Sequence, residues 1–175
     1  MIYYFADIHF GHKNILKYDN RPYATVEEMD EDIIKRWNKK VNNNDDIYII
    51  GDICMGNPSR YLDRLKGRKH LIIGNHDKET LKSCRHYFES IDYYKKIHDN
   101  GKTIILCHYP MAEWDGFYRG TYHIYGHIHN SVNNTYLIMR QFENALNAGC
   151  MINNYEPVTL QELIINNFDF KTKNK

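Results

Sequence analysis

The sequence predicts an α/β fold that contains both parallel and antiparallel strands, and three observations support this prediction. Short β-branched and aromatic runs stop at Gly, Asp or His, which is typical of buried parallel strands that end at a ligand-bearing edge. The segment from residue 25 to residue 41 carries apolar residues at helical intervals. Asn100-Gly101 joins two further apolar runs and favours a β-hairpin, so at least one strand pair is antiparallel.

The length of 175 residues suits a single domain, residues 1–175, because a chain of this size buries about 70% of its unfolded surface. A formal net charge of +1 argues against a large basic surface that would bind nucleic acid or a membrane. It is compatible with a small local basic patch. No apolar run approaches the roughly 18 residues that span a bilayer, so we expect a cytoplasmic protein with no membrane partner. The four cysteines form no Cys-x-x-Cys pair, which favours reduced thiols. The oligomeric state is not predicted.

Residues 1–6 predict the first strand, which is followed by Asp7 and His9. Side chains two positions apart in an extended strand point the same way and lie about 6.5–7 Å apart, so these two can converge on one ion. His12, Asn14 and Arg21 follow in a loop. For these three residues, a hydrogen-bonded loop and a contact to substrate are both open.

Thr25 and Glu28 have the spacing of a capping box and begin the predicted helix, in which Trp37 is expected in the core. Residues 47–50 predict a second strand that ends at Asp52. Cys54 is interpreted as a small buried hydrophobic residue rather than a soft metal ligand.

A short helix is predicted over residues 58–65, and residues 70–73 predict a strand that ends at Gly74-Asn75-His76-Asp77. Residues 79–88 predict another helix. The hairpin arms, residues 93–98 and 103–107, lead to His108.

The loop over residues 111–120 carries aromatic residues and Arg119, and it is either a substrate lip beside the site or ordinary packing. Residues 122–125 predict a strand that leads to His127 and His129, and residues 136–151 predict one or two more strands. Thr159 and Glu162 cap a short last helix or turn, after which residues 168–175 are expected to form a frayed tail.

Metal-competent side chains therefore follow five separate apolar runs: Asp7 and His9, Asp52, Asn75 with His76, His108, and His127 with His129. The chain has ten histidines, so any single one is compatible with a structural role, but chance does not account for the whole set. Such nitrogen and oxygen ligands can serve two ions when one carboxylate bridges them, and Asp52 stands alone on its strand. Histidine and carboxylate ligands together favour Mn, Fe, Zn, Ni or Co.

These motifs, in this order, resemble the calcineurin-like metallophosphoesterase superfamily, whose pattern is Asp-x-His, Gly-Asp, Gly-Asn-His-Asp/Glu, a lone His after a strand, and Gly-His-x-His. The resemblance covers residues 1 to about 150. Residues 7–15, followed by Arg21-Pro22, are also similar to small stand-alone bacterial and phage phosphoesterases. The resemblance implies a sandwich of two mixed β-sheets flanked by helices, with a dimetal site at the C-terminal ends of the strands.

The resemblance also implies roles for the candidate residues. One ion would be held by Asp7, His9, Asp52 and His129, and the other by Asp52, Asn75, His108 and His127. A hydroxide that bridges the ions would attack a phosphomonoester or phosphodiester. His76 would protonate the leaving group, and Asp77 would orient the imidazole of His76.

The second motif departs from the superfamily, because Gly51-Asp52-Ile53-Cys54 lacks the Arg of the Gly-Asp-x-x-Asp-Arg-Gly pattern. A protein-phosphatase activity is therefore not expected, and Arg21, Arg119 or His12 would have to contact the substrate. Two alternatives remain: a non-catalytic metal-binding scaffold on the same fold, and a nuclease or nucleotide phosphodiesterase, although near-neutral charge disfavours long polyanions. The expected partner is a phosphate-ester substrate, either a small molecule or a nucleotide.

Overall fold

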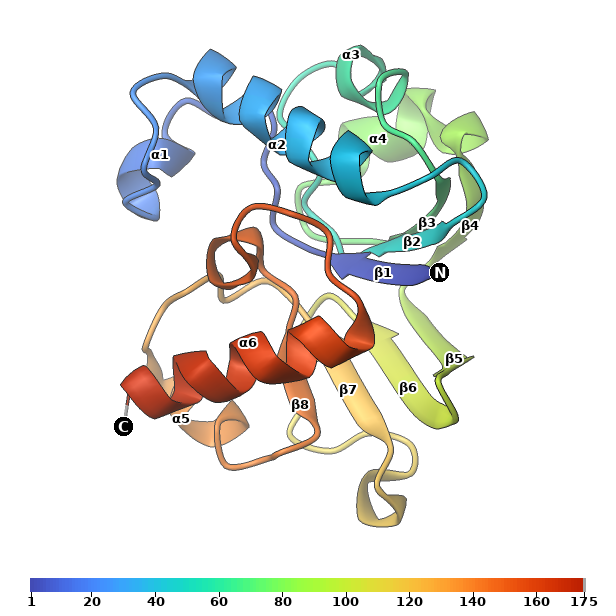
Figure 1. Cartoon of the computed structure of the whole chain (residues 1–175), viewed down its shortest axis with the longest axis vertical. Helices are drawn as coiled ribbons and strands as arrows, with labels where there is room; N and C mark the ends of the chain where they lie inside the picture. Colours follow the sequence, from blue (N-terminus) through green and yellow to red (C-terminus); the bar gives the residue numbers. More distant parts are fainter. Residues whose placement is uncertain (175) are drawn as a thin grey trace.

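Two four-stranded β-sheets lie one above the other in the computed structural model, which describes residues 1–174 (Figure 1). The first sheet is parallel throughout and has the order β1-β2-β3-β4: β1 (Ile2–Phe5), β2 (Asp46–Ile49), β3 (Arg68–Ile72) and β4 (Phe88–Asp92). The second sheet has the order β5-β6-β7-β8: β5 (Tyr94–Asp99), β6 (Lys102–Cys107), β7 (Tyr122–Tyr125) and β8 (Ala145–Asn147).

The second sheet is mixed, since β5 is antiparallel to β6 whereas β6, β7 and β8 are parallel. The β5–β6 hairpin turns at Asn100 and Gly101, whose φ angles are +48° and +73°. Both angles are positive, as a two-residue turn matched to the strand twist requires, so the predicted Asn-Gly hairpin is confirmed. The α/β prediction is also confirmed, with one parallel sheet and one mixed sheet in place of two mixed sheets.

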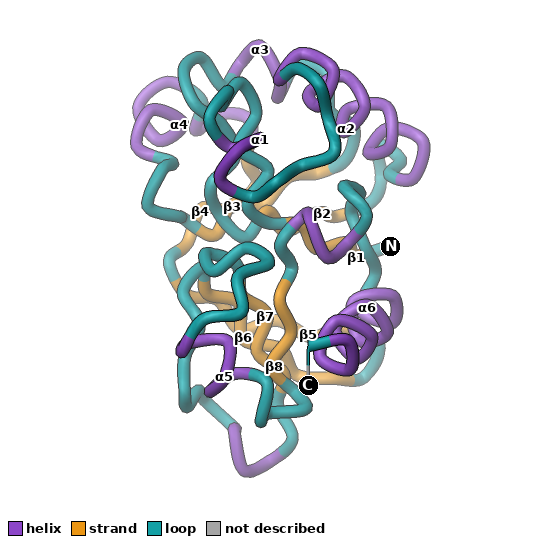
Figure 2. Tube along the Cα trace, turned by 90° about the vertical axis from the view of Figure 1, so that its left-hand side faces the viewer, coloured by secondary structure: helices purple, strands orange, loops and turns teal. Residues whose placement is uncertain are grey.

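Helices flank both sheets. They are α1 (Ile15–Tyr18), α2 (Val26–Lys40), α3 (Ser59–Leu62), α4 (Lys78–Ser83), α5 (Asn134–Met139) and α6 (Leu160–Lys173), with short 3-10 turns η1 (Arg85–Tyr87), η2 (Phe117–Arg119) and η3 (Cys150–Asn153). Helices α2, α3 and α4 lie above the first sheet in Figure 1, and Figure 2 shows α6 beside the second sheet. Within residues 1–174, none of these helices is long and apolar enough to cross a membrane.

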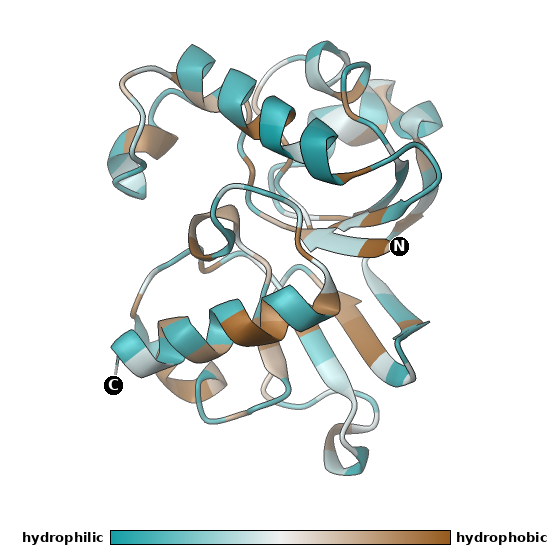
Figure 3. Ribbon diagram, viewed as in Figure 1, coloured by the Kyte–Doolittle hydropathy of each residue, from teal (hydrophilic) through white to brown (hydrophobic). Residues whose placement is uncertain are grey.

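Strands β1 and β2 of the first sheet are buried on both faces. In β1, Tyr3 and Phe5 pack in the cluster beneath α2, whereas Tyr4 and the next residue beyond the strand, Ala6, pack against the second sheet. This alternation follows from the two-residue period of a strand. In Figure 3, β6 is hydrophobic along most of its length, while α2 is mostly hydrophilic with apolar interruptions. The two sheets therefore share the core that lies between them, whereas α2 covers a separate apolar cluster on the other face of the first sheet.

The helix predicted from residue 25 begins as expected, because the Thr25 hydroxyl accepts a hydrogen bond from the Glu28 amide. Trp37 is fully buried, and its indole N–H donates to the Lys66 carbonyl. Cys54 is also buried, and burial raises the pKa of its thiol to about 12. The structural interpretations of Trp37 and Cys54 are thus confirmed.

The predicted frayed tail over residues 168–175 is wrong for residues 168–173, because α6 continues to Lys173. Thr159 and Glu162 form the full capping box at its start. Near its end, Phe170 packs on Tyr136, and the Lys171 ammonium donates to two backbone carbonyls. These long-range contacts hold the last turns of α6 in place. Residue 175 lies outside the described residues.

Two other segments differ from the predictions. The helix expected over residues 79–88 ends at Ser83, and the chain then enters β4, which the sequence did not reveal. β4 is an edge strand with no fully buried residue, so it lacks the apolar run that marked the other strands. In the segment 136–151 the structure has one strand, β8, preceded by the short helix α5.

Candidate metal centre

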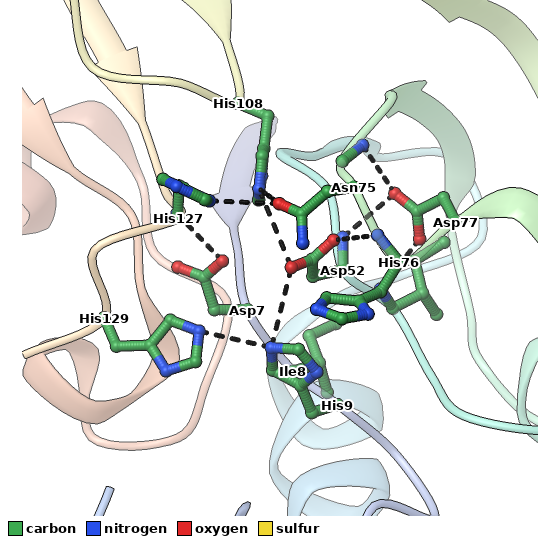
Figure 4. Close-up of polar contacts among 12 residues, drawn as sticks. Asp7, Ile8, His9, Asp52, Asn75, His76, Asp77, His108, His127 and His129 are labelled. Atoms are coloured by element: carbon green, nitrogen blue, oxygen red, sulfur yellow. Dashed lines mark hydrogen bonds and ion pairs between the residues drawn. The ribbon is translucent and has the colours of Figure 1, made fainter. Parts of the chain in front are cut away.

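The C-terminal ends of strands from both sheets meet at one place. The two sheets are joined there, because the amide of Ala6 donates to the Ala148 carbonyl and the amide of Cys150 donates to the Ala6 carbonyl. Figure 4 shows the predicted ligands gathered at this junction: Asp7, His9, Asp52, Asn75, His108, His127 and His129. The structure therefore brings all seven together, although they come from five strand ends in two different sheets.

The backbone turns sharply at most of these positions. Five of the candidate ligands have a φ angle between +52° and +69°: Asp7, His9, Asp52, His127 and His129. Residues other than glycine adopt this left-handed region only in a few per cent of cases, and such outliers gather at functional sites. The chain thus turns sharply after β1, β2 and β7 and directs its next side chains into the junction.

A glycine precedes three of the five ligand motifs and makes room for a neighbouring motif. A Cβ atom at Gly126 would lie 2.9 Å from the Asp7 carboxylate, a Cβ at Gly74 would overlap Asp52, and a Cβ at Gly51 would overlap His108. Gly51 also has a φ angle of +81°. The glycines are needed because the motif loops approach more closely than any side chain would permit.

Asp52 lies at the centre of the cluster and is almost fully buried. One carboxylate oxygen, Oδ1, accepts a hydrogen bond of 2.8 Å from the His76 amide. The other, Oδ2, lies 3.7 Å from His9 Nε2 and 3.6 Å from His108 Nε2. One oxygen is therefore anchored to the backbone, and the other points between two imidazoles.

Asp7 is arranged in a similar way. Its Oδ1 accepts from the His127 amide at 3.0 Å, whereas its Oδ2 is buried without a hydrogen-bond partner among the described residues. Burial raises the pKa of Asp7 to about 6, which shows how poorly the isolated carboxylate is compensated. Two groups of ligand atoms each lie within 4.8 Å of one another: those of Asp7, His9 and His129, and those of Asp7, Asp52 and His108.

The tautomer of His108 follows from its hydrogen bonds. Its Nδ1 lies 2.8 Å from the Ile50 carbonyl, which can only accept, so Nδ1 carries a proton and Nε2 is directed into the cluster. His108 Nε2 lies 3.1 Å from the Asn75 side-chain oxygen, and His127 Nδ1 lies 3.0 Å from the same oxygen. Two imidazole nitrogens from different strand ends thus meet at one amide group.

His129 is held by Asp19, a residue that the sequence analysis did not single out. The Nδ1 atom of His129 lies 2.7 Å from Asp19 Oδ1. Burial lowers the pKa of His129, but the hydrogen bond and charge of Asp19 outweigh it, so the pKa is raised. The proton on Nδ1 leaves Nε2 to face the cluster, where it lies 3.2 Å from His9 Nε2. Burial and the neighbouring His129 lower the pKa of His9 to about 2, so its ring stays neutral.

Comparisons with known proteins place the chain in a family. No family model matches the sequence. The uncharacterized protein MJ1445 of Methanocaldococcus jannaschii is 33% identical over 168 residues, which cover 93% of this chain and 89% of that protein. The chain belongs to the MJ1445 family.

Solved structures extend this relationship. The protein of unknown function AQ665 from Aquifex aeolicus has a TM-score of 0.76 and 28% sequence identity, covering 93% of this chain and 96% of that chain. The phosphoesterase Yfce from E. coli has a TM-score of 0.40 and 19% identity over 73% of this chain and 69% of that chain, which is too weak to argue from. The similarity of this chain to a solved structure thus rests on AQ665.

Asp77 does not orient the imidazole of His76, which corrects the prediction. The carboxylate of Asp77 is fully buried and accepts three backbone hydrogen bonds, from the amides of Asp52, Ile53 and Gly74, at 2.7–3.0 Å. Burial raises the pKa of Asp77, and these hydrogen bonds oppose that rise. In this member of the MJ1445 family, Asp77 fastens the Asp52 loop to the end of β3.

Arg21 is not available to a substrate, which is a second correction. Its side chain is fully buried and donates to the carbonyls of Asp7 and Ile8 at 2.8 and 2.7 Å. It also donates two hydrogen bonds, of 3.0 and 2.9 Å, to Asp19 Oδ2. Arg21 therefore connects the turn after β1 with Asp19 and, through it, with His129.

The structure does not bring Arg119 to the site. Arg119 lies three positions before the start of β7, whereas His127 follows the strand, so the two residues lie at opposite ends of it. Figure 1 shows the segment of η2 at the far end of the second sheet. Trp114 in the same loop is buried, packs on His123 and donates to the Thr121 carbonyl, which supports the packing interpretation of residues 111–120.

The remaining candidates lie at different depths. His76 is exposed, and its ring centroid is 5.5 Å from that of His9. His12 is half-buried, also with its ring centroid 5.5 Å from that of His9, and burial lowers its pKa. Asn14 is exposed at the start of α1, without a side-chain capping bond. His76 and His12 thus border the cluster, while Asn14 has no demonstrated contact with it.

Proposed function

We propose that this chain is a dimetal-dependent phosphoesterase that hydrolyses a phosphomonoester or a phosphodiester. The observation that carries the proposal is a buried cluster of carboxylate and imidazole groups whose lone pairs cations would satisfy. Asp7 Oδ2 is buried without a partner among residues 1–174, and Asp52 Oδ2 lies 3.7 Å from His9 Nε2 and 3.6 Å from His108 Nε2. A buried polar group without a partner costs about 1–3 kcal/mol, and more when it is charged.

The donor set fits divalent transition metals. Asp52 points one oxygen between His9 and His108, as a carboxylate shared by two ions would. Asp7, His9 and His129 would complete one site, and Asn75, His108 and His127 the other. Imidazole with carboxylate ligands favours Mn, Fe, Zn, Ni or Co over Ca. When bound, such ions supply the positive charge that polarises a phosphoryl group and lowers the pKa of water.

The residues of the chain would do the remaining work. Arg21 and Asp19 hold His129 with Nε2 toward the cluster, and Asp77 holds the loop that presents Asp52. His76 is anchored by its amide to Asp52, and its exposed ring borders the cluster. A ring nitrogen of His76 would give its proton to the alkoxide that leaves as the P–O bond breaks, a role suited to an imidazole near neutral pH.

The test is hydrolysis of 4-nitrophenyl phosphate and bis(4-nitrophenyl) phosphate by metal-stripped protein refilled with Mn, Ni, Zn or Mg. Turnover that returns with metal would support the proposal and reveal the preference between monoester and diester. Two ions bound per chain, with no turnover of either ester, would favour a non-catalytic metal-binding scaffold. Failure to bind ions at all would remove the basis of the proposal.

A further inference from the structure

A pocket of about 390 Å³ opens directly beside the candidate metal centre. It shares His127 and His129 with the centre and is also lined by Tyr109, Pro110, Ile128, Ser131, Asn133 and Thr135. Its volume lies within the range of about 300–1,000 Å³ that is typical of pockets for small organic ligands. A phosphate group alone would leave most of this space empty.

The lining is polar but carries no permanent charge. None of its residues is Lys, Arg, Asp or Glu. Ser131 and Thr135 offer hydroxyl groups, and the Asn133 oxygen is occupied by the Tyr136 amide, so its NH₂ group remains to donate. A second phosphate or another anionic group would find no cation in this pocket apart from its histidines. Neutral groups that carry hydroxyls or carbonyls fit this lining better.

Among the described residues that line the pocket, Tyr109 supplies the only aromatic ring other than the two imidazoles. It follows His108 directly, the residue is 47% exposed, and its ring centroid lies 4.6 Å from that of His127. An exposed tyrosine ring beside a reactive centre offers a rigid platform for a planar partner at little cost in conformational entropy. The contact to His127 holds this platform against the cluster.

The pocket and His76 border different sides of the cluster. Figure 4 shows His127 and His76 separated by Asp7 and Asp52. A phosphodiester has two organic groups, so one can leave beside His76 while the other remains in the pocket. A monoester has only one organic group and would use only one of the two sides.

We propose that this pocket binds the retained organic group of a phosphodiester, an uncharged nucleoside-like group whose planar ring stacks on Tyr109 and whose hydroxyls meet Ser131 and Thr135. This inference rests on the proposed phosphoesterase function and narrows its substrate class. Tyr109 is then the residue that determines specificity, because its stacking adds binding free energy only for esters that place a ring there.

The test compares two diesters that share the 4-nitrophenolate leaving group, methyl 4-nitrophenyl phosphate and thymidine 5′-(4-nitrophenyl) phosphate. Because the bond that breaks is the same, the ratio of kcat/KM reports on the retained group. Stacking of one base predicts a ratio of at least about fivefold in favour of the thymidine ester. Calorimetry on the metal-loaded protein should show the same preference for thymidine 5′-phosphate over methyl phosphate.

Substitutions of Tyr109 test whether its ring causes the preference for the thymidine ester. Tyr109→Ala should bring the ratio close to one, and Tyr109→Phe should keep most of it, because the ring rather than the hydroxyl makes the stack. Tyr118→Ala is the matched control, since Tyr118 is 86% exposed and lies at the other end of β7, and it should leave the ratio unchanged.

Equal kcat/KM for both esters, or a preference that survives Tyr109→Ala, would overturn this inference while leaving the phosphoesterase intact. Cleavage of neither ester by metal-loaded protein would overturn the proposed function and this inference with it. Unchanged thermal stability and metal content of the Tyr109 variants would show that the loss of preference does not come from misfolding.

Discussion

Replacing Asp77 with Asn separates two roles that the sequence alone does not distinguish. If Asp77 oriented the imidazole of His76, Asp77→Asn would reduce turnover and leave the protein and its metal content intact. In the structure the carboxylate instead accepts the amides of Asp52 and Gly74 on Oδ2, and that of Ile53 on Oδ1. We therefore expect Asp77→Asn to weaken folding and metal binding together.

The expected loss of stability in Asp77→Asn follows from the number of hydrogen-bond acceptors that remain. The single oxygen of Asn can replace Oδ2, but its NH₂ group then faces the Ile53 amide as donor against donor. A buried donor without a partner costs about 1–3 kcal/mol. The neutral amide recovers part of this cost, because burial disfavours the Asp77 carboxylate and raises its pKa. For a protein of this length, a loss of 1–3 kcal/mol lowers Tm by roughly 2–12 °C.

The assay is thermal unfolding of the metal-free protein, followed by metal analysis and titration calorimetry of Asp77→Asn. Asp169→Asn is the matched control, because Asp169 is exposed on α6 and surface changes stay within about ±0.5 kcal/mol. His76→Ala serves as the catalytic comparison. Unchanged Tm and metal affinity in Asp77→Asn, with lower turnover only, would refute the assignment of Asp77 to the backbone of the Asp52 loop.

Three further substitutions test the site. His76→Ala should slow kcat by about 10²–10⁴-fold at unchanged metal content, and a fall in bound metal would contradict its assignment as proton donor. Asp52→Asn should reduce metal binding and activity together, measured by metal analysis and ester hydrolysis, and full activity would exclude a shared carboxylate ligand. Asp19→Asn should weaken metal affinity about 10- to 100-fold in calorimetry, because Asp19 holds the Nδ1 proton of His129. Unchanged affinity in that variant would argue against its positioning role.

The convergence of the seven candidate ligands could be predicted from the sequence, because each follows a recognisable strand. Buried strands leave a clear apolar run, and side chains just beyond their C-terminal ends meet at one edge. The sequence did not reveal, from the residues alone, that these ends belong to two sheets. That arrangement depends on long-range pairing such as Ala6 with Ala148 and Cys150, which leaves no local pattern.

The roles of the supporting residues could not be predicted from the sequence, for a different reason. Arg21 and Asp77 have the chemistry of catalytic residues, but Asp77 bonds to backbone amides, and Arg21 bonds to backbone carbonyls and to Asp19. The positions of these partners exist only in the folded chain. Asp19 lies two residues before Arg21, and its interaction with His129 spans 110 positions. The one available signal was an acidic and a basic residue in the loop that follows the Asp-x-His motif.

The C-terminal helix contributes to the site although it carries none of the candidate ligands. The Asn147 side chain donates to the His129 carbonyl at 2.7 Å. The backbone amide of Asn147 donates to the side-chain oxygen of Asn167 in α6, also at 2.7 Å. Asn167 in turn donates to the Asn147 carbonyl at 3.0 Å, and all three contacts are shielded from solvent at least in part. His129 has a φ angle of +52°, a conformation that persists only when its surroundings hold it. Residues 1–150 supply every candidate ligand, but α6 is part of what keeps His129 turned toward the candidate metal centre.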